Sequence, residues 1–399
     1  MPTSSAPALP PRLARIVHAE YPRFSAGEMA RRRSAVERML AEAECDHLVF
    51  YGANRFGGAV NWLTGWPVTT EAACVLTPAR RDTLYIHYFN HLPLARILAA
   101  DADVHWAGPS AVGSVVGELQ RRGAARDRVA LIGPLGWQGH AVLSQAFGTI
   151  KGLDREFVEL RRIKSAEELD WMRIGAWLSD LGMAAMRDHV RPGMSERAIH
   201  DVIERGYVAA GGGHGIHFTA FTPMHRPRMP VPAQWASNRK LAAGDVLFAE
   251  ITAQFWDYSG QVLRTFTVGT PPSGLYRDLH DTAEAAFDAM VSVIRAGARP
   301  ADVVEAAGVI EDRGFTTIDD IVHGYGGGYL PPVLSSRSRT EGAHPVPDRA
   351  FDAGMLLVIQ PNVVTRDGSA GVQTGEMVLV TETGVKRMHR MPRGLVRIG

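Results

Sequence analysis

Two side chains that can do chemistry lie on a segment with the pattern of a β-hairpin. Residues 244–269 read GDVLFAEITAQFWDYSGQVLRTFTVG, which is two strand-like runs joined by a short polar turn. Glu250 lies on the first run, and Gln261 follows eleven residues later on the second. Such hairpins often carry a metal, but hard cations need anionic oxygen ligands, and Gln261 stands where a second carboxylate is wanted. The residue types therefore favour an organic group at this hairpin over a cation.

Other familiar catalytic patterns are missing from the sequence. It contains no G-x-x-x-x-G-K-[ST] phosphate loop, no G-x-S-x-G serine elbow, no H-E-x-x-H zinc motif and no clustered cysteine pairs. The stretch GGGHGIH at 211–217 superficially resembles an oxyanion-hole loop. Because no serine elbow accompanies it, we interpret this stretch as a flexible connection from a helix to a strand. We expect the two cysteines, Cys45 and Cys74, to be core thiols.

The composition indicates a globular protein with a small partner. The 399-residue chain is 46% hydrophobic, and its length predicts two domains. Lys and Arg (43) nearly balance Asp and Glu (42), so we expect neither nucleic acid nor a membrane surface as a partner. The first residues, MPTSSAPALPP, lack the features of a secretory signal, and no apolar run is long enough to span a bilayer. These features predict a cytoplasmic protein that binds a small molecule.

Hydropathy patterns divide the chain near residue 160. Residues 1–160 alternate helical segments with strand-like runs such as CDHLVFYG and RVALIG, which is typical of an α/β domain. Residues 161–399 begin with a long amphipathic helix, and a second helix follows with Ser195 as its expected N-cap. Pairs of helices then alternate with pairs of strands, and HGYGGGYLPP is expected to be a Gly-rich loop. This order predicts an α+β domain whose antiparallel sheet carries helices on one face.

A series of short motifs follows a fixed order along the second domain. They are L-x-x-G-D (241–245), R-T-F-x-V-G-x-P (264–271), H-G-Y-G (323–326), G-M-x-x-x-I-x-P (354–361) and V-L-V-T-E-x-G (378–384). Together with the helix LRRIKSAEELDWMRIGAW and the N-terminal NWLTG, they resemble the creatinase, prolidase and aminopeptidase P family. The resemblance runs from about Phe24 to Thr383. It implies an α/β N-terminal domain plus an α+β pita-bread C-terminal domain.

The resemblance also implies where metal ligands would lie. Metal-dependent members of the family hold two divalent cations with two Asp, one His and two Glu. These five positions match Glu250, Gln261, Gly327, Gln360 and Gly375 in this sequence. One carboxylate of five remains, and neutral amides cannot offset two adjacent dications. We therefore predict no metal at these positions and no cofactor.

Creatinase works without metal in this family, but its mechanism does not transfer to this sequence. Its proton-transferring His matches Ala233, and its Glu beside the hairpin Arg matches Leu263. The remaining polar side chains at the expected cavity are Glu250, Gln261 and Gln360. They are either a hydrogen-bonded structural relic or a grip for an amide, carboxylate or phenol. We favour ligand contact, because burying three polar side chains in an apolar sheet is unfavourable unless they are paired.

The resemblance places Arg264 and His323 at the same cavity. His323 has an intrinsic pKa suited to general acid or base work near neutral pH, and a loop-bracing role is equally compatible with its position. The residues His214, His217 and His225 lie on Gly- or Pro-rich stretches and are expected to face solvent. Of these three, His225 is a candidate for the mouth of the cavity.

The resemblance also predicts a homodimer. In creatinase-like dimers the N-terminal domain of one subunit reaches the active site of the other. By their position after the T-G-W turn, Trp66 and Glu71 occupy the corresponding segment and are candidate substrate contacts. The alternative is that Trp66 belongs to the core and Glu71 to the surface.

These observations predict a metal-independent enzyme that cleaves a C–N or related bond in a small organic substrate, as a hydrolase or a lyase. His323 and Glu250 are the expected proton carriers. Gln261, Gln360 and Arg264 are expected to orient the substrate and to stabilise developing negative charge. One alternative is a non-catalytic binding protein that kept the scaffold. The other is a metal-dependent Xaa-Pro peptidase, for which the sequence lacks the water-activating ligands.

Overall fold

The computed structural model describes residues 8–53 and 58–399, which form two compact units. The smaller unit comprises residues 18–161. The larger unit comprises residues 162–399 together with the N-terminal helix α1 (Pro11–Val17). The expected boundary after residue 160 thus lies one residue from the division in the structure, whereas α1 belongs to the larger unit.

The smaller unit is a six-stranded sheet covered by helices. Its strands are β1 (His47–Ala53), β2 (Glu71–Leu76), β3 (Asp82–Ile86), β4 (Ala102–Trp106), β5 (Val129–Ile132) and β6 (Ile150–Gly152), in the order β4-β3-β2-β1-β5-β6. Its helices are α2 (Ala26–Glu42), α3 (Ala59–Thr64), the short 3-10 turn η1 (Phe89–His91), α4 (Leu92–Leu98), α5 (Ala111–Arg121), α6 (Trp137–Phe147) and α7 (Asp154–Leu160). β2 runs antiparallel to both of its neighbours, and the other pairs are parallel.

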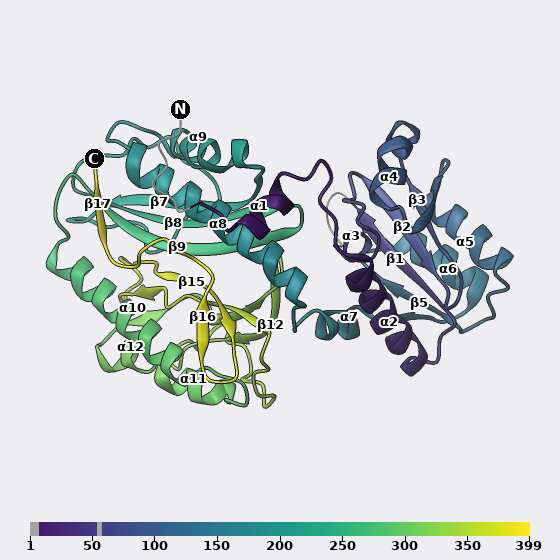
Figure 1. Ribbon diagram of the computed structural model, residues 1–399. Helices are drawn as coiled ribbons and strands as arrows, with labels where there is room; N and C mark the ends of the chain where they lie inside the picture. The colour runs from purple at the N-terminus through teal and green to yellow at the C-terminus, as the bar shows by residue number, and fades with distance from the viewer. Residues whose placement is uncertain (1–7, 54–57) are drawn as a thin grey trace. The chain divides into compact units, whose positions relative to one another are not determined.

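Alternate residues of these strands bury opposite faces of the sheet. Val49 on β1 belongs to the apolar cluster that includes Val115 of α5 and Leu143 of α6. Its neighbour Phe50 points the other way and contacts the ring of Phe157 on α7 at 5.8 Å between centroids. Figure 1 shows helices on both sides of this sheet. The structure confirms the predicted α/β N-terminal domain.

The larger unit is built on a nine-stranded sheet. Its strands are β7 (Gly213–Pro223), β8 (Asp245–Phe255), β9 (Tyr258–Val268), β11 (Val322–Tyr325), β12 (Tyr329–Leu334), β13 (Leu356–Ile359), β15 (Gly375–Val380), β16 (Val385–Arg387) and β17 (Val396–Ile398). The order is β12-β11-β13-β15-β9-β8-β7, with β16 paired to β15 and β17 to β9. A separate two-stranded sheet pairs β10 (Thr316–Thr317) with β14 (Val363–Val364).

The helices of this unit fall into two groups. The first is α8 (Ala166–His189), α9 (Glu196–Tyr207) and the short η2 (Val208–Ala210); the second is α10 (Gly274–Val293), α11 (Pro300–Ala306) and α12 (Val309–Asp312). A capping box between Ser165 and Glu168 starts α8, and Ser195 caps α9 as predicted. In Figure 1 the first group lies along β7, β8 and β9, and the second lies beside the other strands. Two helix groups therefore cover the curled sheet, whereas the sequence predicted helices on one face only.

Two stretches that the sequence predicted as loops are strands. The Gly-rich HGYGGGYLPP forms β11 and β12, which pair antiparallel with an irregularity between His323 and Gly324. The stretch GGGHGIH enters β7, which pairs with β8 along its length from Gly213 opposite Gln254 to Pro223 opposite Asp245. Glycine weakens the local strand signal, and here the pairing with β8 overrides it.

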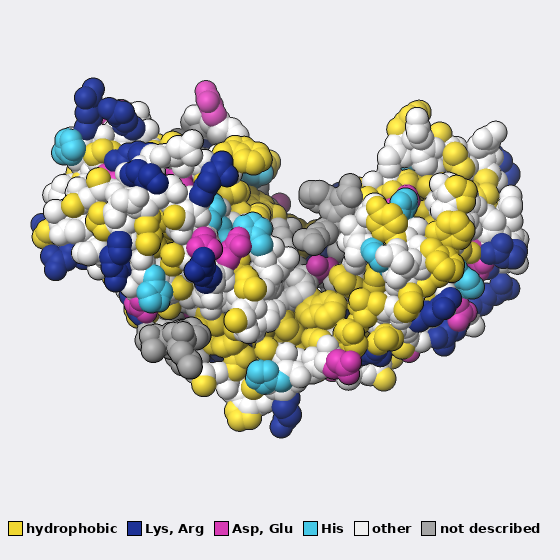
Figure 2. Space-filling model, turned by 90° about the horizontal axis from the view of Figure 1, so that it is seen from above, with side chains coloured by type: hydrophobic (Ala, Val, Ile, Leu, Met, Phe, Trp, Pro, Cys, Tyr) yellow, Lys and Arg dark blue, Asp and Glu magenta, His cyan; other side chains and the backbone are white. Residues whose placement is uncertain are grey.

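Charged side chains of both signs lie on the face of the molecule drawn in Figure 2. Figure 2 shows Lys and Arg side chains interspersed with Asp, Glu and uncharged side chains on the face it presents. Within residues 8–53 and 58–399, no helix has the length and apolar character needed to cross a bilayer.

Candidate active site

The β8–β9 hairpin brings Glu250 and Gln261 together. The strands are joined by a turn at 256–257, and the register pairs Thr252 with Gln261 and Glu250 with Leu263. Glu250 and Gln261 therefore lie on the same face of the hairpin. The Gln261 Nε2 donates a hydrogen bond of 2.9 Å to Glu250 Oε1. The hairpin predicted from the sequence is confirmed, with its carboxylate and amide directly bonded.

Two further amides extend this cluster. Gln360 follows β13, and its Oε1 lies 3.4 Å from the Nε2 of Gln261. Gln373 precedes β15, and its side chain hydrogen-bonds the Glu250 carboxylate. Both glutamines are buried. The structure thus brings Gln360 to the predicted site and adds Gln373, which sequence reasoning missed.

A pair of aspartates closes the other side of the cluster. Asp319 and Asp320 lie in the bend between β10 and β11. Asn362 donates a 3.2 Å hydrogen bond to Asp319 Oδ2, and the Tyr329 hydroxyl donates one of 3.1 Å to Asp320 Oδ1. The Gln360 Nε2 lies 3.4 Å from Oδ2 of each aspartate. The signal available in the sequence was the paired carboxylate of TTIDDIV directly before the strand that carries His323.

The surroundings of the carboxyl groups hold protons on them near neutral pH. Burial, followed by the nearby charge of Asp319, raises the pKa of Glu250 to about 7. Burial and the same neighbour raise the pKa of Asp320 to about 8. Two carboxyl groups that titrate near neutrality are therefore connected through amide side chains, an arrangement suited to moving protons.

His323 lies at this cluster, and the sequence did not predict its protonation state. Its side chain is buried on β11 and stacks on the ring of Tyr329, with 3.8 Å between centroids. Burial lowers the pKa of His323 to about 4, and the Gly324 carbonyl, Asp319 and Gln360 oppose this shift only in part. The intrinsic pKa of an imidazole suits proton transfer near neutral pH, but here desolvation shifts it, because a buried imidazole resists protonation. At pH 7 the ring is neutral and is a hydrogen-bond acceptor or base.

The tautomer of His323 follows from its contact with a backbone carbonyl. Its Nδ1 lies 3.0 Å from the Gly324 carbonyl, which can only accept, so Nδ1 carries the proton. The Nε2 atom then presents a lone pair, and it is buried without a hydrogen-bond partner among the described residues. An unpaired buried acceptor is costly and indicates a place where a donor can bind.

Arg264 does not lie at this cluster, which corrects the predicted substrate contact. It is three residues beyond Gln261 on β9 and therefore points to the opposite face of the strand. Its fully buried guanidinium donates to Glu376 Oε2 at 2.7 Å and to backbone carbonyls, including those of Gly375 and Met391. These contacts occupy the guanidinium and give Arg264 a structural role in joining β9 to the C-terminal segment.

Of the other predicted contacts, His225 lies away from this cluster within the larger unit, and Trp66 and Glu71 belong to the smaller unit. His225 is exposed in the turn after β7, well beyond Phe218, the β7 residue that pairs with Glu250. Trp66 is buried in the smaller unit. Glu71 accepts a 2.8 Å hydrogen bond from the Tyr51 hydroxyl in the same unit. These contacts favour the alternative that Trp66 and Glu71 have structural roles in the smaller unit. Their contact with the substrate of a partner subunit stays a prediction.

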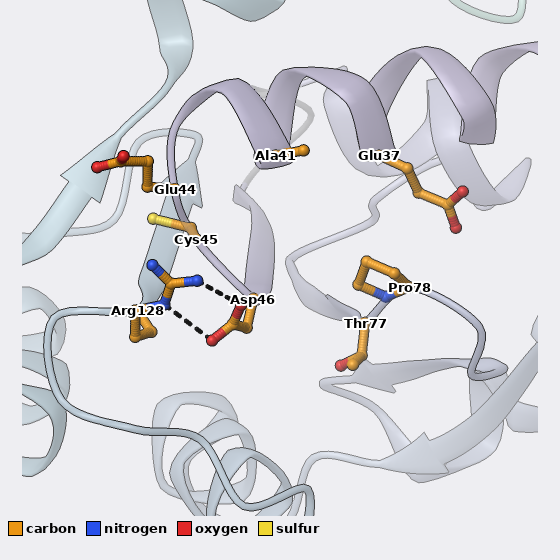
Figure 3. A pocket seen from close by; sticks show the side chains of 8 residues that line it. All are labelled: Glu37, Ala41, Glu44, Cys45, Asp46, Thr77, Pro78 and Arg128. Atoms are coloured by element: carbon orange, nitrogen blue, oxygen red, sulfur yellow. Dashed lines mark hydrogen bonds and ion pairs between the residues drawn. The ribbon is translucent and has the colours of Figure 1, made fainter.

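A pocket in the smaller unit has a different character. It is lined by Glu37, Ala41, Glu44, Cys45, Asp46, Thr77, Pro78 and Arg128. Figure 3 shows Arg128 binding Asp46 across it, through hydrogen bonds of 2.9 and 2.8 Å to the two carboxylate oxygens. Cys45 is a free, buried thiol whose pKa is raised by burial, so it is a poor nucleophile. This pocket lacks the proton-holding carboxyl groups of the Glu250 cluster.

Comparison with solved structures confirms the fold. An Xaa-Pro dipeptidase from Bacillus anthracis superposes with a TM-score of 0.78 at 17% identity, covering 93% of this chain and 100% of that one. An X-Pro aminopeptidase from Thermotoga maritima gives 0.78 at 17% identity, covering 92% and 99%. Both are pita-bread proteins, so the larger unit has the predicted pita-bread fold. At these identities the likeness establishes the fold alone.

Sequence comparison identifies curated relatives at 24% identity. An Xaa-Pro dipeptidase from Pyrococcus furiosus is 24% identical over 254 residues, covering 62% of this chain and 68% of the relative. An ectoine hydrolase from Halomonas elongata is 24% identical over 243 residues, covering 59% and 60%. The chain thus aligns with about two thirds of the length of these relatives. The sequence profile of metallopeptidase family M24 matches residues 170–382, more than half of the 399 residues, and the chain belongs to that family.

Proposed function

We propose that this protein is a metal-independent hydrolase that cleaves a C–N bond in a small organic substrate, with Glu250 as the proton carrier. The observation that carries the proposal is the Glu250 carboxyl, with a pKa of about 7, hydrogen-bonded to Gln261 at 2.9 Å. A carboxyl that titrates at the working pH can accept a proton from water and return it to a leaving nitrogen.

The residues at the family's metal positions do not fit two divalent cations. The Gln261 Nε2 directs an N–H at the Glu250 oxygen where a cation would bind. A Cβ at Gly375 would lie 2.4 Å from the Ile359 carbonyl, so that position is closed to a side chain unless the backbone shifts. A side chain at Gly327 would meet the Asp257 carbonyl at the hairpin turn, away from Glu250. The donor set is that of a hydrogen-bonded cluster.

The unpaired atoms around Glu250 indicate the class of substrate. Gln373 Oε1, Asn362 Oδ1 and His323 Nε2 are buried acceptors without a partner among the described residues. Each of their side chains contacts Glu250, Asp319 or Gln360. Acceptors at this site complement a substrate that donates N–H groups, such as an amide, urea or lactam. Asp320, protonated near neutral pH, is placed to donate to the carbonyl oxygen of such a substrate.

Two other functions are weaker candidates. A metal-dependent Xaa-Pro dipeptidase activity is favoured by the names of relatives, but the chemistry of the Glu250 donor set opposes it. A non-catalytic binding protein would keep the same polar pocket without turnover. The homodimer suggested by the resemblance, and the lyase alternative to hydrolysis, remain part of this proposal.

Turnover measurements with controlled metal content separate these functions. Purified protein is treated with a chelator and screened against small amides, ureas, lactams and Xaa-Pro dipeptides. We expect turnover of a small non-peptide substrate that survives chelation, and kcat/KM that rises with pH up to about 7 as Glu250 loses its proton. Activity that requires restored manganese, iron, zinc or cobalt would overturn the proposal. Ligand binding without turnover of any compound would favour the binding protein.

A further inference from the structure

A second group of titratable side chains lies where α9 packs on β7, outside the Glu250 cluster. Glu204, His214 and His217 each place one potential ligand atom within 4.8 Å of the others, and this is the one such group of three or more among the described residues. We propose that these three side chains bind a divalent transition-metal ion of the zinc type. Two imidazoles and one carboxylate are the donor set that zinc takes in open three-ligand sites.

A β-bulge places both histidines on one face of β7. Residues three apart on a regular strand point to opposite faces. Here His214 pairs with Ala253 and Ile216 pairs with Thr252, so Gly215 is an extra residue without a partner on β8. A Cβ at Gly215 would lie 2.3 Å from the Thr252 carbonyl, so the bulge requires glycine. As a result, the rings of His214 and His217 lie 4.6 Å apart between centroids.

The helix supplies the carboxylate. Glu204 lies in the last turn of α9, and its Oε1 is 3.0 Å from Nδ1 of His214. The side chains of His214 and Glu204 are 53% and 43% exposed, so both can reorient around an ion that enters from solvent. The expectation that His214 faces solvent is confirmed, whereas His217 is buried beneath it.

The contacts of His217 present the correct nitrogen for a metal. Its Nδ1 lies 2.7 Å from the Ile216 carbonyl and therefore carries the proton. Metal-binding histidines are commonly oriented by a hydrogen bond from one ring nitrogen to a backbone carbonyl. This bond leaves the lone pair on the other ring nitrogen, which can then bind the metal. The Nε2 lone pair accepts a 2.7 Å hydrogen bond from the Tyr207 hydroxyl. Metal binding replaces this one bond, and the hydroxyl turns away or toward another acceptor.

This site is separate from the proposed catalytic cluster. His217 pairs with Ile251 on β8, the neighbour of Glu250, so His217 and Glu250 point to opposite faces of the sheet. The inference therefore does not rest on the proposed function. Zinc bound here would tie α9 to the edge strand β7.

Zinc titration of the full-length protein after chelation tests the proposal. We expect one equivalent of zinc to bind by calorimetry, and one equivalent of Co²⁺ to give the visible spectrum of a nitrogen- and oxygen-ligated site. His214→Ala and Glu204→Gln should each weaken binding by about tenfold or more. His189→Ala is the matched control, because His189 is an exposed histidine at the end of α8, and it should leave binding unchanged.

Three results would overturn the proposal. The first is no stoichiometric zinc binding by the unmodified protein. The second is binding that both His214→Ala and Glu204→Gln leave intact, which would mean an adventitious ion only. The third is binding that is lost in Glu250→Gln and retained in His214→Ala, which would place the ion in the family's usual metal position. Circular dichroism of each variant confirms that it is folded before its affinity is interpreted.

Discussion

The Glu250 cluster and the Glu204 cluster lie on opposite faces of the same sheet and differ in exposure and in the groups around the carboxylate. Around Glu250 the neighbours are buried amides and carboxyls, with Gln360 only 1% exposed. Around Glu204 the neighbours are imidazoles, and the Glu204 side chain is 43% exposed. Burial raises the pKa of Glu250 and suits it to proton transfer, whereas the exposed side chain of Glu204 is accessible to a cation from solvent. The local surroundings, more than residue type, determine the chemistry proposed for each glutamate.

Glu250→Gln is the change with the largest expected effect. It removes the ionisable group but keeps the shape of the side chain, so turnover should fall by about 10²- to 10⁴-fold. Zinc stoichiometry should stay at that of the unmodified protein, because the variant leaves the α9–β7 group intact. Steady-state kinetics and zinc calorimetry on one preparation measure both. Glu382→Gln, on an exposed glutamate of the same unit, is the control.

A variant that keeps full turnover would remove Glu250 from the mechanism. A variant that loses both turnover and zinc binding would show that the two clusters are not independent.

Asp320→Asn tests whether the folded protein raises the pKa of the Asp320 carboxyl group in the first cluster. The folded protein holds the pKa of Asp320 at about 8, and the ordinary value is 3.8. Between these values the unfolded chain loses the proton and the folded chain keeps it, so this group lowers stability as pH rises from about 4 to about 8. Asparagine lacks this effect, so between pH 4 and pH 9 the variant should gain stability relative to the unmodified protein, by up to about 6 kcal/mol for a shift of about four pH units.

Urea denaturation at the two pH values measures this difference, and the exposed Asp348→Asn is the control. An equal effect of Asp320→Asn at both pH values would contradict a raised pKa.

Zinc should stabilise the protein through the second cluster only. At a concentration about 100 times the dissociation constant, a ligand that binds only the folded state adds about 2.7 kcal/mol to the free energy of unfolding. We expect this gain in the unmodified protein and in Glu250→Gln, whereas a tenfold or greater loss of affinity in His214→Ala should reduce it to about 1.4 kcal/mol or less at the same zinc concentration. Denaturation with and without zinc gives the values. Equal stabilisation of His214→Ala would place the bound ion elsewhere.

Tyr207→Phe has the smallest expected effect, and it tests one contact directly, the hydrogen bond between the Tyr207 hydroxyl and the His217 ring. It removes the hydroxyl that occupies the His217 Nε2 lone pair, and it keeps the buried ring. A hydrogen bond contributes about 1 kcal/mol, so zinc should bind about fivefold more tightly. Tyr276→Phe is the control, since that buried hydroxyl has no partner among the described residues. Weaker zinc binding in Tyr207→Phe would mean that the hydroxyl itself helps to hold the ion.

The sequence predicted the parts of the active site that follow from short-range pattern. The β8–β9 hairpin, the placement of Glu250 and Gln261 on one face, the Ser195 cap of α9 and the family were all recognisable. It missed Asp319, Asp320 and Gln373, because their approach to Glu250 depends on contacts between β9, β11, β13 and β15 across long stretches of chain. It also assigned Arg264 to the substrate, where alternation along β9 directs it to Glu376.

By themselves, the residue types and their order determined the family to which this chain belongs and the strands and helices of its scaffold. Those properties depend on side-chain chemistry and on the period of strands and helices, which the sequence carries directly. Only the tertiary structure decided the protonation of Glu250, Asp320 and His323, because a pKa depends on burial and neighbouring charge. Likewise, the stretch GGGHGIH contains both His214 and His217. The bulge at Gly215 and the packing of α9 were needed to bring His214, His217 and Glu204 together.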